Sequence, residues 1–157
     1  MISLIARIVA DPALAEDLAQ ETFVKAYRNL AAFDTTRRLS SWLFRIAHNT
    51  ALDSLRRARG PIASLSTLSE SHAAHRAPAP AEPDPVEQEA LRQALSGAMA
   101  RLRPEYRAAM ALRYDEGLAF DEVAQVMGIP EATARSHVHR ARKELARALA
   151  DAGWLQK

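Results

Sequence analysis

The chain has 157 residues, a formal net charge of +2 and no cysteine. Its apolar residues are dominated by 33 Ala and 18 Leu, against 6 Val and 6 Ile, a balance that favours helices and argues against a β-sandwich, a barrel or a parallel-sheet enzyme. The lack of cysteine excludes a disulfide scaffold and thiolate metal sites, and a charge of +2 is too small to predict nucleic-acid binding unless the basic residues are clustered.

The front part of the chain predicts three helices, over about 2–10, 13–31 and 40–59. The first is apolar but interrupted by Arg7, so it predicts an amphipathic helix rather than a signal peptide. No run of the chain approaches the ~18 apolar residues that span a bilayer. The second helix is expected to pack through a stripe of Leu14, Leu18, Thr22, Ala26 and Leu30, with Ala19, Phe23 and Tyr27 alongside. The third is expected to be capped by Ser40 or Ser41 and to pack through Leu43, Ala47, Ala51 and Leu55.

The following segment, 59–86, predicts a flexible tether. It is rich in Ala and Ser and holds Pro78, Pro80, Pro83 and Pro85, and proline at that density blocks helix. Residues 58–90 contain two basic and five acidic residues, net −3, between flanks of net +2 (1–57) and +3 (91–157). The alternative is an ordered loop docked on a domain.

The remaining residues predict four helices, over about 86–102, 104–116, 119–127 and 131–152. The segment FDEVAQVMGIPEATARSHVHRAR, residues 120–142, has the pattern of a helix-turn-helix. Ala124 is small enough for two helices to cross closely, and Gly128 can take a positive φ at the turn. The two helices are expected to pack through Val123, Met127, Ile129 and Val138.

The last helix carries the clustered charge. Between residues 132 and 147 there are five basic residues and one acidic residue, net +4. Arg135, Ser136, His139, Arg140 and Lys143 fall on one face at helical spacing. Such a face fits the major groove of DNA, where side chains near the start of the helix read base edges and later basic residues bind phosphate. The alternative is a solvated basic face.

These motifs resemble the sigma-70 family of bacterial RNA polymerase sigma factors. The segment 102–145 is similar to region four of the family, and the segments 15–34 and 40–57 are similar to region two. Two such lobes with only a tether between them resemble the extracytoplasmic function (ECF) group. The resemblance implies an all-α fold of two small helical domains: a region-two-like domain over 1–58, a flexible linker over 59–86, and a region-four-like helix-turn-helix domain over 87–157.

The resemblance also implies the partners. They are core RNA polymerase, through its β′ clamp helices and β flap, promoter DNA, and an anti-sigma factor. It implies a cytoplasmic protein that is not an enzyme, with no cofactor, no metal and no small-molecule substrate.

Site residues follow from the resemblance position by position. Those matching the minus-35 reading helix are Arg135, Ser136, His139 and Arg140, and Lys143 lies on the same helix face. Those matching the minus-10 surface are Arg37 and Arg38 in the loop 32–39, and Trp42, Arg45, His48, Asn49 and Arg56 on the next helix. Those matching the polymerase-binding face are Asp17, Gln20, Glu21 and Val24. For Trp42, packing in the core stays an open alternative, because its neighbours Leu43 and Phe44 are apolar.

The chain departs from the family at its start. Region two normally begins with a further helix ahead of the segment matched by 2–10. Without that helix, Leu4, Ile5, Ile8 and Leu18 lack a partner, at a cost of ~1.5–3 kcal/mol for each large side chain left exposed. We therefore expect either a front lobe that is less stable than the back lobe, or an extra contact, with a second copy of the chain or with a partner, that covers it.

Two other classes of protein remain as alternatives. A helix-turn-helix regulator that acts without core polymerase would explain the back lobe but not the front lobe. An enzyme would need a site built on His72 and His75 in the tether, or on His137 and His139, which should point away from each other on a helix. The sequence shows no Gly-rich phosphate loop, nucleophile elbow or paired carboxylates to support catalysis.

Overall fold

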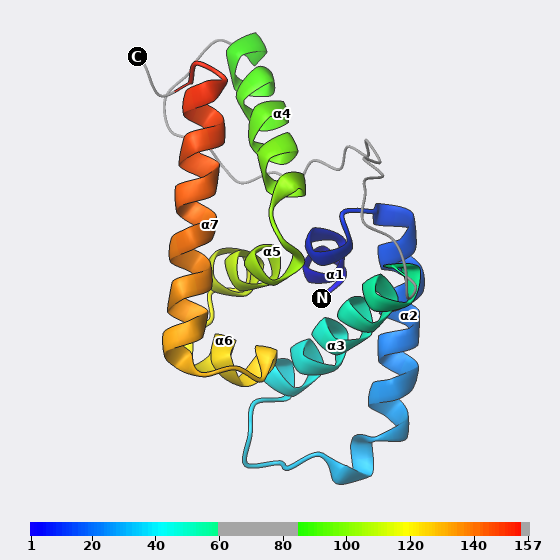
Figure 1. Cartoon of the computed structure of the whole chain (residues 1–157). Coiled ribbons are helices and arrows are strands. Elements are labelled where there is room, and N and C mark those ends of the chain that lie inside the picture. The colour runs from blue at the N-terminus through cyan, green and yellow to red at the C-terminus, as the bar shows by residue number, and fades with distance from the viewer. Residues whose placement is uncertain (60–84, 155–157) are drawn as a thin grey trace.

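The computed structural model describes residues 1–59 and 85–154, and in these residues all regular structure is helical (Figure 1). The elements are α1 (Ile2–Val9), α2 (Pro12–Arg28), the short 3-10 turn η1 (Leu30–Ala32), α3 (Leu39–Arg59), α4 (Pro85–Arg101), α5 (Pro104–Met110), the π-helical turn η2 (Ala111–Asp115), α6 (Phe120–Met127) and α7 (Glu131–Asp151). The predicted all-α fold is confirmed. Most of the predicted tether, 60–84, lies outside the described residues.

The front lobe consists of α1, α2 and α3. Asp11, between α1 and α2, is the N-cap of α2, because its Oδ1 accepts a hydrogen bond from the Leu14 N–H at 3.1 Å. Pro12 at the first helical position suits this start. On α3, Ala47 and Ala51 are fully buried, and their small side chains let the neighbouring helices approach closely.

Two details of the front lobe differ from the sequence prediction. Leu30, Phe23 and Tyr27 were expected on the packed side of α2 but are 52, 56 and 81% exposed. The predicted Leu18, Ala19, Thr22 and Ala26 are buried, together with Ala15. Thr22 is tolerated there because its hydroxyl donates to the Leu18 carbonyl at 2.7 Å. Helix α3 begins at Leu39, so Ser40 and Ser41 lie inside its first turn and the predicted N-cap is wrong.

The back lobe is formed by α4 to α7. Helices α4 and α7 lie side by side, with α5 crossing at their lower part (Figure 1). Ala98, Leu102, Tyr106, Ala141 and Leu145 form a small core where these helices meet. The helix predicted over 104–116 is α-helical only to Met110 and continues as the π turn η2, with the Glu116 N–H bonded to the Ala111 carbonyl at 3.0 Å.

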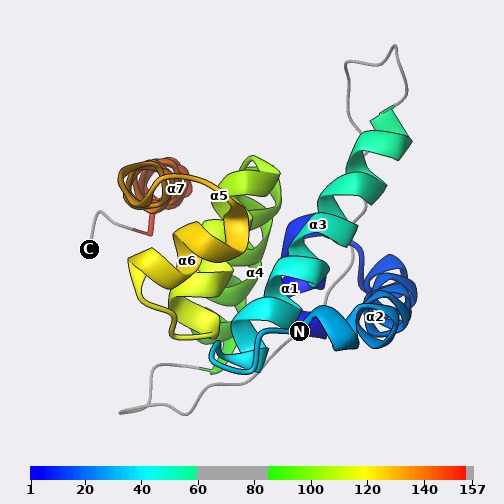
Figure 2. The ribbon, with the colours of Figure 1, turned by 90° about the horizontal axis from the view of Figure 1, so that it is seen from below.

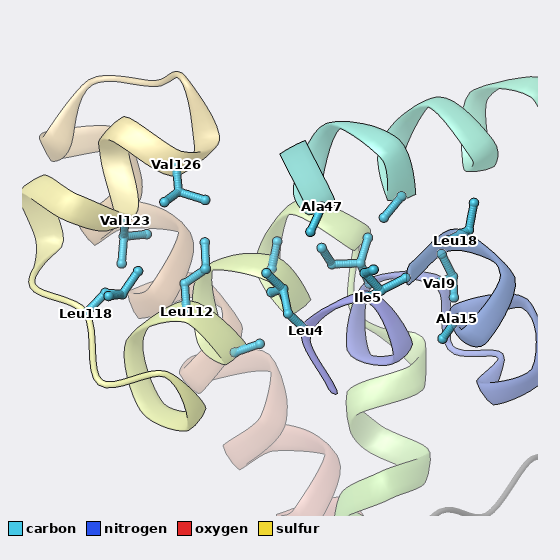
Figure 3. Close-up of a cluster of buried hydrophobic side chains, with 14 of the residues drawn as sticks. Leu4, Ile5, Val9, Ala15, Leu18, Ala47, Leu112, Leu118, Val123 and Val126 are labelled. Atoms are coloured by element: carbon cyan, nitrogen blue, oxygen red, sulfur yellow. The ribbon is translucent and has the colours of Figure 1, made fainter. Parts of the chain in front are cut away.

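The two lobes are packed against each other through α1. One continuous cluster of buried side chains runs from Leu18 and Val9 through Leu4 and Ile5 to Leu112, Val123 and Val126 (Figure 3). Helix α1 packs on α2 and α3 on one side and on α5 and η2 on the other, and α3 also packs on α6. Leu4, Ile5 and Ile8 are 0% exposed. The back lobe of the same chain therefore covers these side chains, where a second copy or a partner was expected.

The arrangement leaves α2 and α7 on opposite sides of the molecule. Both helices are seen end-on in Figure 2, with α1, α3 and α6 between them. The outer faces of these two helices, which carry the predicted polymerase and minus-35 residues, are thus separated by the whole width of the fold.

Candidate nucleic-acid interface

Helices α6 and α7 form the predicted helix-turn-helix. Helix α6 ends at Gly128, whose φ of 67° is the left-handed conformation that the turn requires. The Ile129 N–H then bonds back to the Ala124 carbonyl at 3.1 Å. Val123 and Val138 are buried between the helices. This packing sets the direction of α7 and leaves its outer face in solvent.

The outer face of α7 gathers four of the predicted minus-35 residues. Arg135, Ser136, His139 and Arg140 are exposed and line one shallow hollow. Lys143 is exposed one turn further along the helix. Two guanidinium groups on an exposed helix face can donate hydrogen bonds both to base edges and to phosphates.

The two histidines of α7 face in different directions. The His137 ring lies 5.3 Å from the Tyr106 ring of α5, and burial lowers the pKa of His137 below its usual value. His139 is exposed on the outer face of α7. The pair therefore shares no site, as the helical spacing predicted. His72 and His75 lie outside the described residues.

The loop before α3 holds Arg37 and Arg38 in solvent-exposed positions. Asp34 organises the loop: its Oδ1 accepts hydrogen bonds from the Thr36 hydroxyl at 2.7 Å and the Thr36 N–H at 3.0 Å. These bonds, with Arg37 beside them, hold the pKa of Asp34 below its usual value. Arg37 pairs with Asp34 at 3.4 Å, whereas Arg38 reaches the other lobe and pairs with Glu122 of α6 at 2.6 Å.

Trp42 joins this loop to α3. It is half-buried, and its ring lies 5.2 Å from the Phe33 ring at an interplanar angle of 52°. Tilted aromatic pairs of this kind stabilise by about 0.5–1.5 kcal/mol beyond their buried area. Trp42 thus contributes to the packing of the loop while part of its surface stays in solvent.

The exposed face of α3 carries Arg45, Asn49 and Arg56 in one line along the helix. Arg56 pairs with Asp53 at 3.2 Å. His48 was placed with this group by resemblance, but it is 2% exposed. Burial lowers its pKa, which favours the neutral ring, so His48 belongs to the interior rather than to the exposed surface.

The predicted polymerase-binding residues lie on the outer face of α2. Asp17, Gln20 and Val24 are exposed. Glu21 is half-buried and pairs with Lys25 at 2.7 Å and Arg57 at 3.8 Å. The exposed rings of Phe23 and Tyr27 border this face at helical spacing, so it is a mixed acidic and aromatic surface.

Sequence reasoning missed several residues that contribute to these surfaces. Phe120 lies under the guanidinium groups of Arg113 and Arg135, at 4.8 and 4.5 Å from the ring centroid. Glu122 caps α6 by accepting from the Ala119 N–H at 3.0 Å and also holds Arg38. The S/T/D/N-x-x-E pattern that normally reveals such a cap is absent because the cap position is alanine.

In residues 1–59 and 85–154, no cluster of three or more His, Asp or Glu side chains is placed to hold a metal ion. Over the same ranges, no helix combines the length and apolar character needed to cross a membrane.

Comparison with known proteins defines the class. Residues 1–60 match sigma-70 region 2, and residues 92–145 match sigma-70 region 4. The chain is 36% identical over 154 residues to the RNA polymerase sigma-H factor of Pseudomonas aeruginosa, a match that covers 95% of this chain and 80% of that protein. It is 31% identical over 143 residues to the ECF RNA polymerase sigma factor SigW of Bacillus subtilis, covering 87% of this chain and 76% of that one.

The fold matches solved structures across both lobes. The sigma factor RpoE of Bartonella quintana, in complex with the anti-sigma factor NepR, has a TM-score of 0.74 and 24% identity, covering 99% of this chain and 91% of that chain. CnrH in complex with the cytosolic domain of CnrY has a TM-score of 0.62 and 26% identity, covering 96 and 80%.

The helix-turn-helix, the region 2 lobe and these relatives together place the chain in the sigma-70 family of RNA polymerase sigma factors. More narrowly, the chain belongs to the ECF group of that family and is a transcription initiation factor rather than an enzyme.

Proposed function

We propose that the chain binds core RNA polymerase in the cytoplasm and directs it to promoters by reading two DNA elements with two surfaces. The hollow of α7, lined by Arg135, Ser136, His139 and Arg140, contacts the minus-35 duplex, with Lys143 on phosphate. The loop 32–39 and the exposed side of α3 contact the minus-10 strand through Arg37, Arg38, Trp42, Arg45, Asn49 and Arg56.

One observation supports this assignment most directly. The same short chain carries a complete helix-turn-helix with an exposed basic reading helix and, on a separate helix, a second line of exposed Arg and Asn side chains. A regulator that acts without polymerase needs only the first of these. Two separate DNA-facing surfaces fit a factor that must both locate a duplex element and hold an opened strand.

We further propose that the outer face of α2 binds the β′ clamp helices, and that the back lobe contacts the β flap. Asp17, Gln20 and Val24 are the exposed members of that α2 face, and Phe23 and Tyr27 extend it with large apolar area. Exposed aromatic side chains are typical of protein-binding surfaces. An anti-sigma factor is a further proposed partner, because the matched structure of the sigma factor RpoE contains the anti-sigma factor NepR.

Run-off transcription with core polymerase on a promoter library tests the assignment. We expect core-dependent initiation from the wild-type chain. Arg135→Ala should lose base preference in the minus-35 element, at about 1–3 kcal/mol for the contact removed. Asn49→Ala should keep that preference and lose opening at the minus-10 element, measured by permanganate reactivity of the opened strand.

Gln125→Ala provides a matched control, because Gln125 is an exposed polar residue of α6 outside the assigned surfaces. It should leave both steps unchanged. Tight binding of duplex DNA by the chain alone, with no retention on core polymerase, would contradict the proposal and favour a regulator independent of polymerase.

A further inference from the structure

The guanidinium of Arg135 is held on one edge by a residue of its own helix. Its Nε donates to Oε1 of Glu131 at 3.1 Å, and its Nη2 donates to the same oxygen at 2.5 Å. Glu131 lies one turn earlier in α7, and both side chains remain about half exposed, at 59 and 46%. The ion pair therefore constrains a side chain that would otherwise sample many rotamers.

The face of the same guanidinium is supported from α6. Its central carbon lies 4.5 Å from the centroid of the Phe120 ring, within the range of a cation–π contact. Phe120 is the first residue of α6 and is half-buried. The Arg113 guanidinium lies 4.8 Å from the same centroid and is fixed by a hydrogen bond from its Nη1 to the Leu118 carbonyl at 2.8 Å. The ring is thus restrained on the side of η2 as well.

These contacts leave a particular set of donors available. A guanidinium has five N–H groups, and Glu131 takes one on Nε and one on Nη2. Two N–H groups on Nη1 and one on Nη2 remain, which form the outer fork of the group. That fork can donate two parallel hydrogen bonds to O6 and N7 of guanine, the most common specific contact of arginine in the major groove.

We propose that Phe120 and Glu131 are positioning residues that present the outer fork of Arg135 to a guanine of the minus-35 element. Phe120 acts on the face of the guanidinium and Glu131 on its inner edge, so that Arg135 enters the groove already oriented. This inference rests on the proposed function, because it takes α7 as the helix that reads the minus-35 element. Orienting the group before binding reduces the entropy lost in the complex.

The test uses the full chain with core polymerase and a promoter library randomised over the upstream element, and it measures base preference at each position. We expect one position that prefers guanine and loses the preference in Arg135→Ala. Phe120→Leu should lower the guanine preference about 2- to 10-fold at that position alone, the range expected for losing one cation–π contact. Phe120→Tyr, which keeps the ring face, should retain it, and Glu131→Ala should weaken the same position.

Ile129→Val is the matched control, because Ile129 is a half-buried apolar residue of the same helix-turn-helix. It should leave the preference at every position unchanged, and the thermal midpoint of each variant shows whether the fold is intact. The positioning role is wrong if Phe120→Leu weakens all positions alike, or if it leaves intact a preference that Arg135→Ala abolishes. A base other than guanine at that position also contradicts the proposal.

Failure of the proposed minus-35 role and failure of the positioning role would give different results. If Arg135→Ala removes no base preference anywhere, the proposed minus-35 role of α7 is wrong. If Arg135→Ala removes the preference and Phe120→Leu, Phe120→Tyr and Glu131→Ala all match the wild type, only the positioning role is wrong.

Discussion

Arg107 connects three helices through one guanidinium and is only 7% exposed. Its Nη1 donates to the Ala100 and Leu102 carbonyls at 2.7 and 3.1 Å, where α4 ends, and its Nη2 donates to the Ile8 carbonyl at 2.5 Å, in the last turn of α1. Carbonyl groups at the end of a helix have no partner inside the helix and carry partial negative charge. The buried cation is therefore compensated by backbone dipoles.

Replacing Arg107 should lower the stability of the fold. Arg107→Leu leaves carbonyl groups at two helix ends buried without their donor, so we expect the free energy of unfolding to fall by about 3 kcal/mol. Urea denaturation followed by circular dichroism measures the change. Arg103→Leu is the control, because Arg103 is exposed and surface changes usually stay within about 0.5 kcal/mol. An equal loss in both variants would contradict the special role of Arg107.

At the scale of single elements, the turn between α6 and α7 depends on one backbone conformation. Gly128 ends α6 with a φ of 67°, and its N–H bonds to the Ala124 carbonyl. A side chain at this φ clashes with the backbone by about 1–2 kcal/mol. Space is not the constraint, because an added Cβ would meet nothing within 4 Å. The backbone angle alone selects glycine here.

A pair of glycine substitutions separates the effect of the backbone angle from the effect of the space for a side chain. Gly128→Ala should lower the free energy of unfolding by about 1–2 kcal/mol. Gly97→Ala should raise it by about 0.5–1 kcal/mol, because Gly97 lies inside α4, where alanine is the better helix former and an added Cβ is also in open space. Thermal denaturation of both variants checks the opposite signs. Destabilisation by Gly97→Ala would show that α4 has a close neighbour at that point.

At the scale of the whole molecule, the two lobes hold each other in a closed arrangement. The shared core includes Leu4, Ile5 and Leu112, and ion pairs cross its edges between Arg7 and Asp115 at 3.2 Å and between Arg38 and Glu122 at 2.6 Å. Separating the lobes would expose large apolar side chains at ~1.5–3 kcal/mol each. A closed form is therefore expected for the free chain.

The closed form does not suit simultaneous reading of two promoter elements. Elements two helical turns apart are separated by ~70 Å, whereas a compact chain of this length has a radius of gyration of ~15 Å. Arg38, on the proposed minus-10 loop, is held by Glu122 of the helix-turn-helix and must exchange that carboxylate for phosphate. Promoter binding with core polymerase is thus expected to require the lobes to separate.

Distances between spin labels test this expectation. The chain has no cysteine, so Ala58→Cys on α3 and Gln125→Cys on α6, both at exposed positions, can be labelled selectively. The distance should be short in the free chain and lengthen by tens of Å with core polymerase and promoter DNA. A second pair within the back lobe, Gln125→Cys with Ala146→Cys, should not change. An unchanged distance between the lobes would contradict the opening.

Local sequence patterns predicted the helices and the helix-turn-helix well because they depend on neighbours along the chain. Apolar spacing located each helix of the described residues to within a few positions, and Gly128 marked the turn. The exposed α7 residues Arg135, Ser136, His139 and Arg140 followed from the same periodicity. Errors arose where the environment comes from distant residues: Phe23 and Tyr27 are exposed, and His48 is buried.

The sequence by itself was enough to predict an all-helical chain with a helix-turn-helix, because periodicity, turn chemistry and clustered charge are local properties, and its resemblance to the sigma-70 family indicated the family. Only the tertiary structure decided that α1 is buried between the lobes, that Arg107 bonds to Ile8 and that Glu122 holds Arg38. Those partners are separated by 99 and 84 positions in sequence. Their contacts depend on how amphipathic faces pair in space, and local pattern carries no information about that pairing.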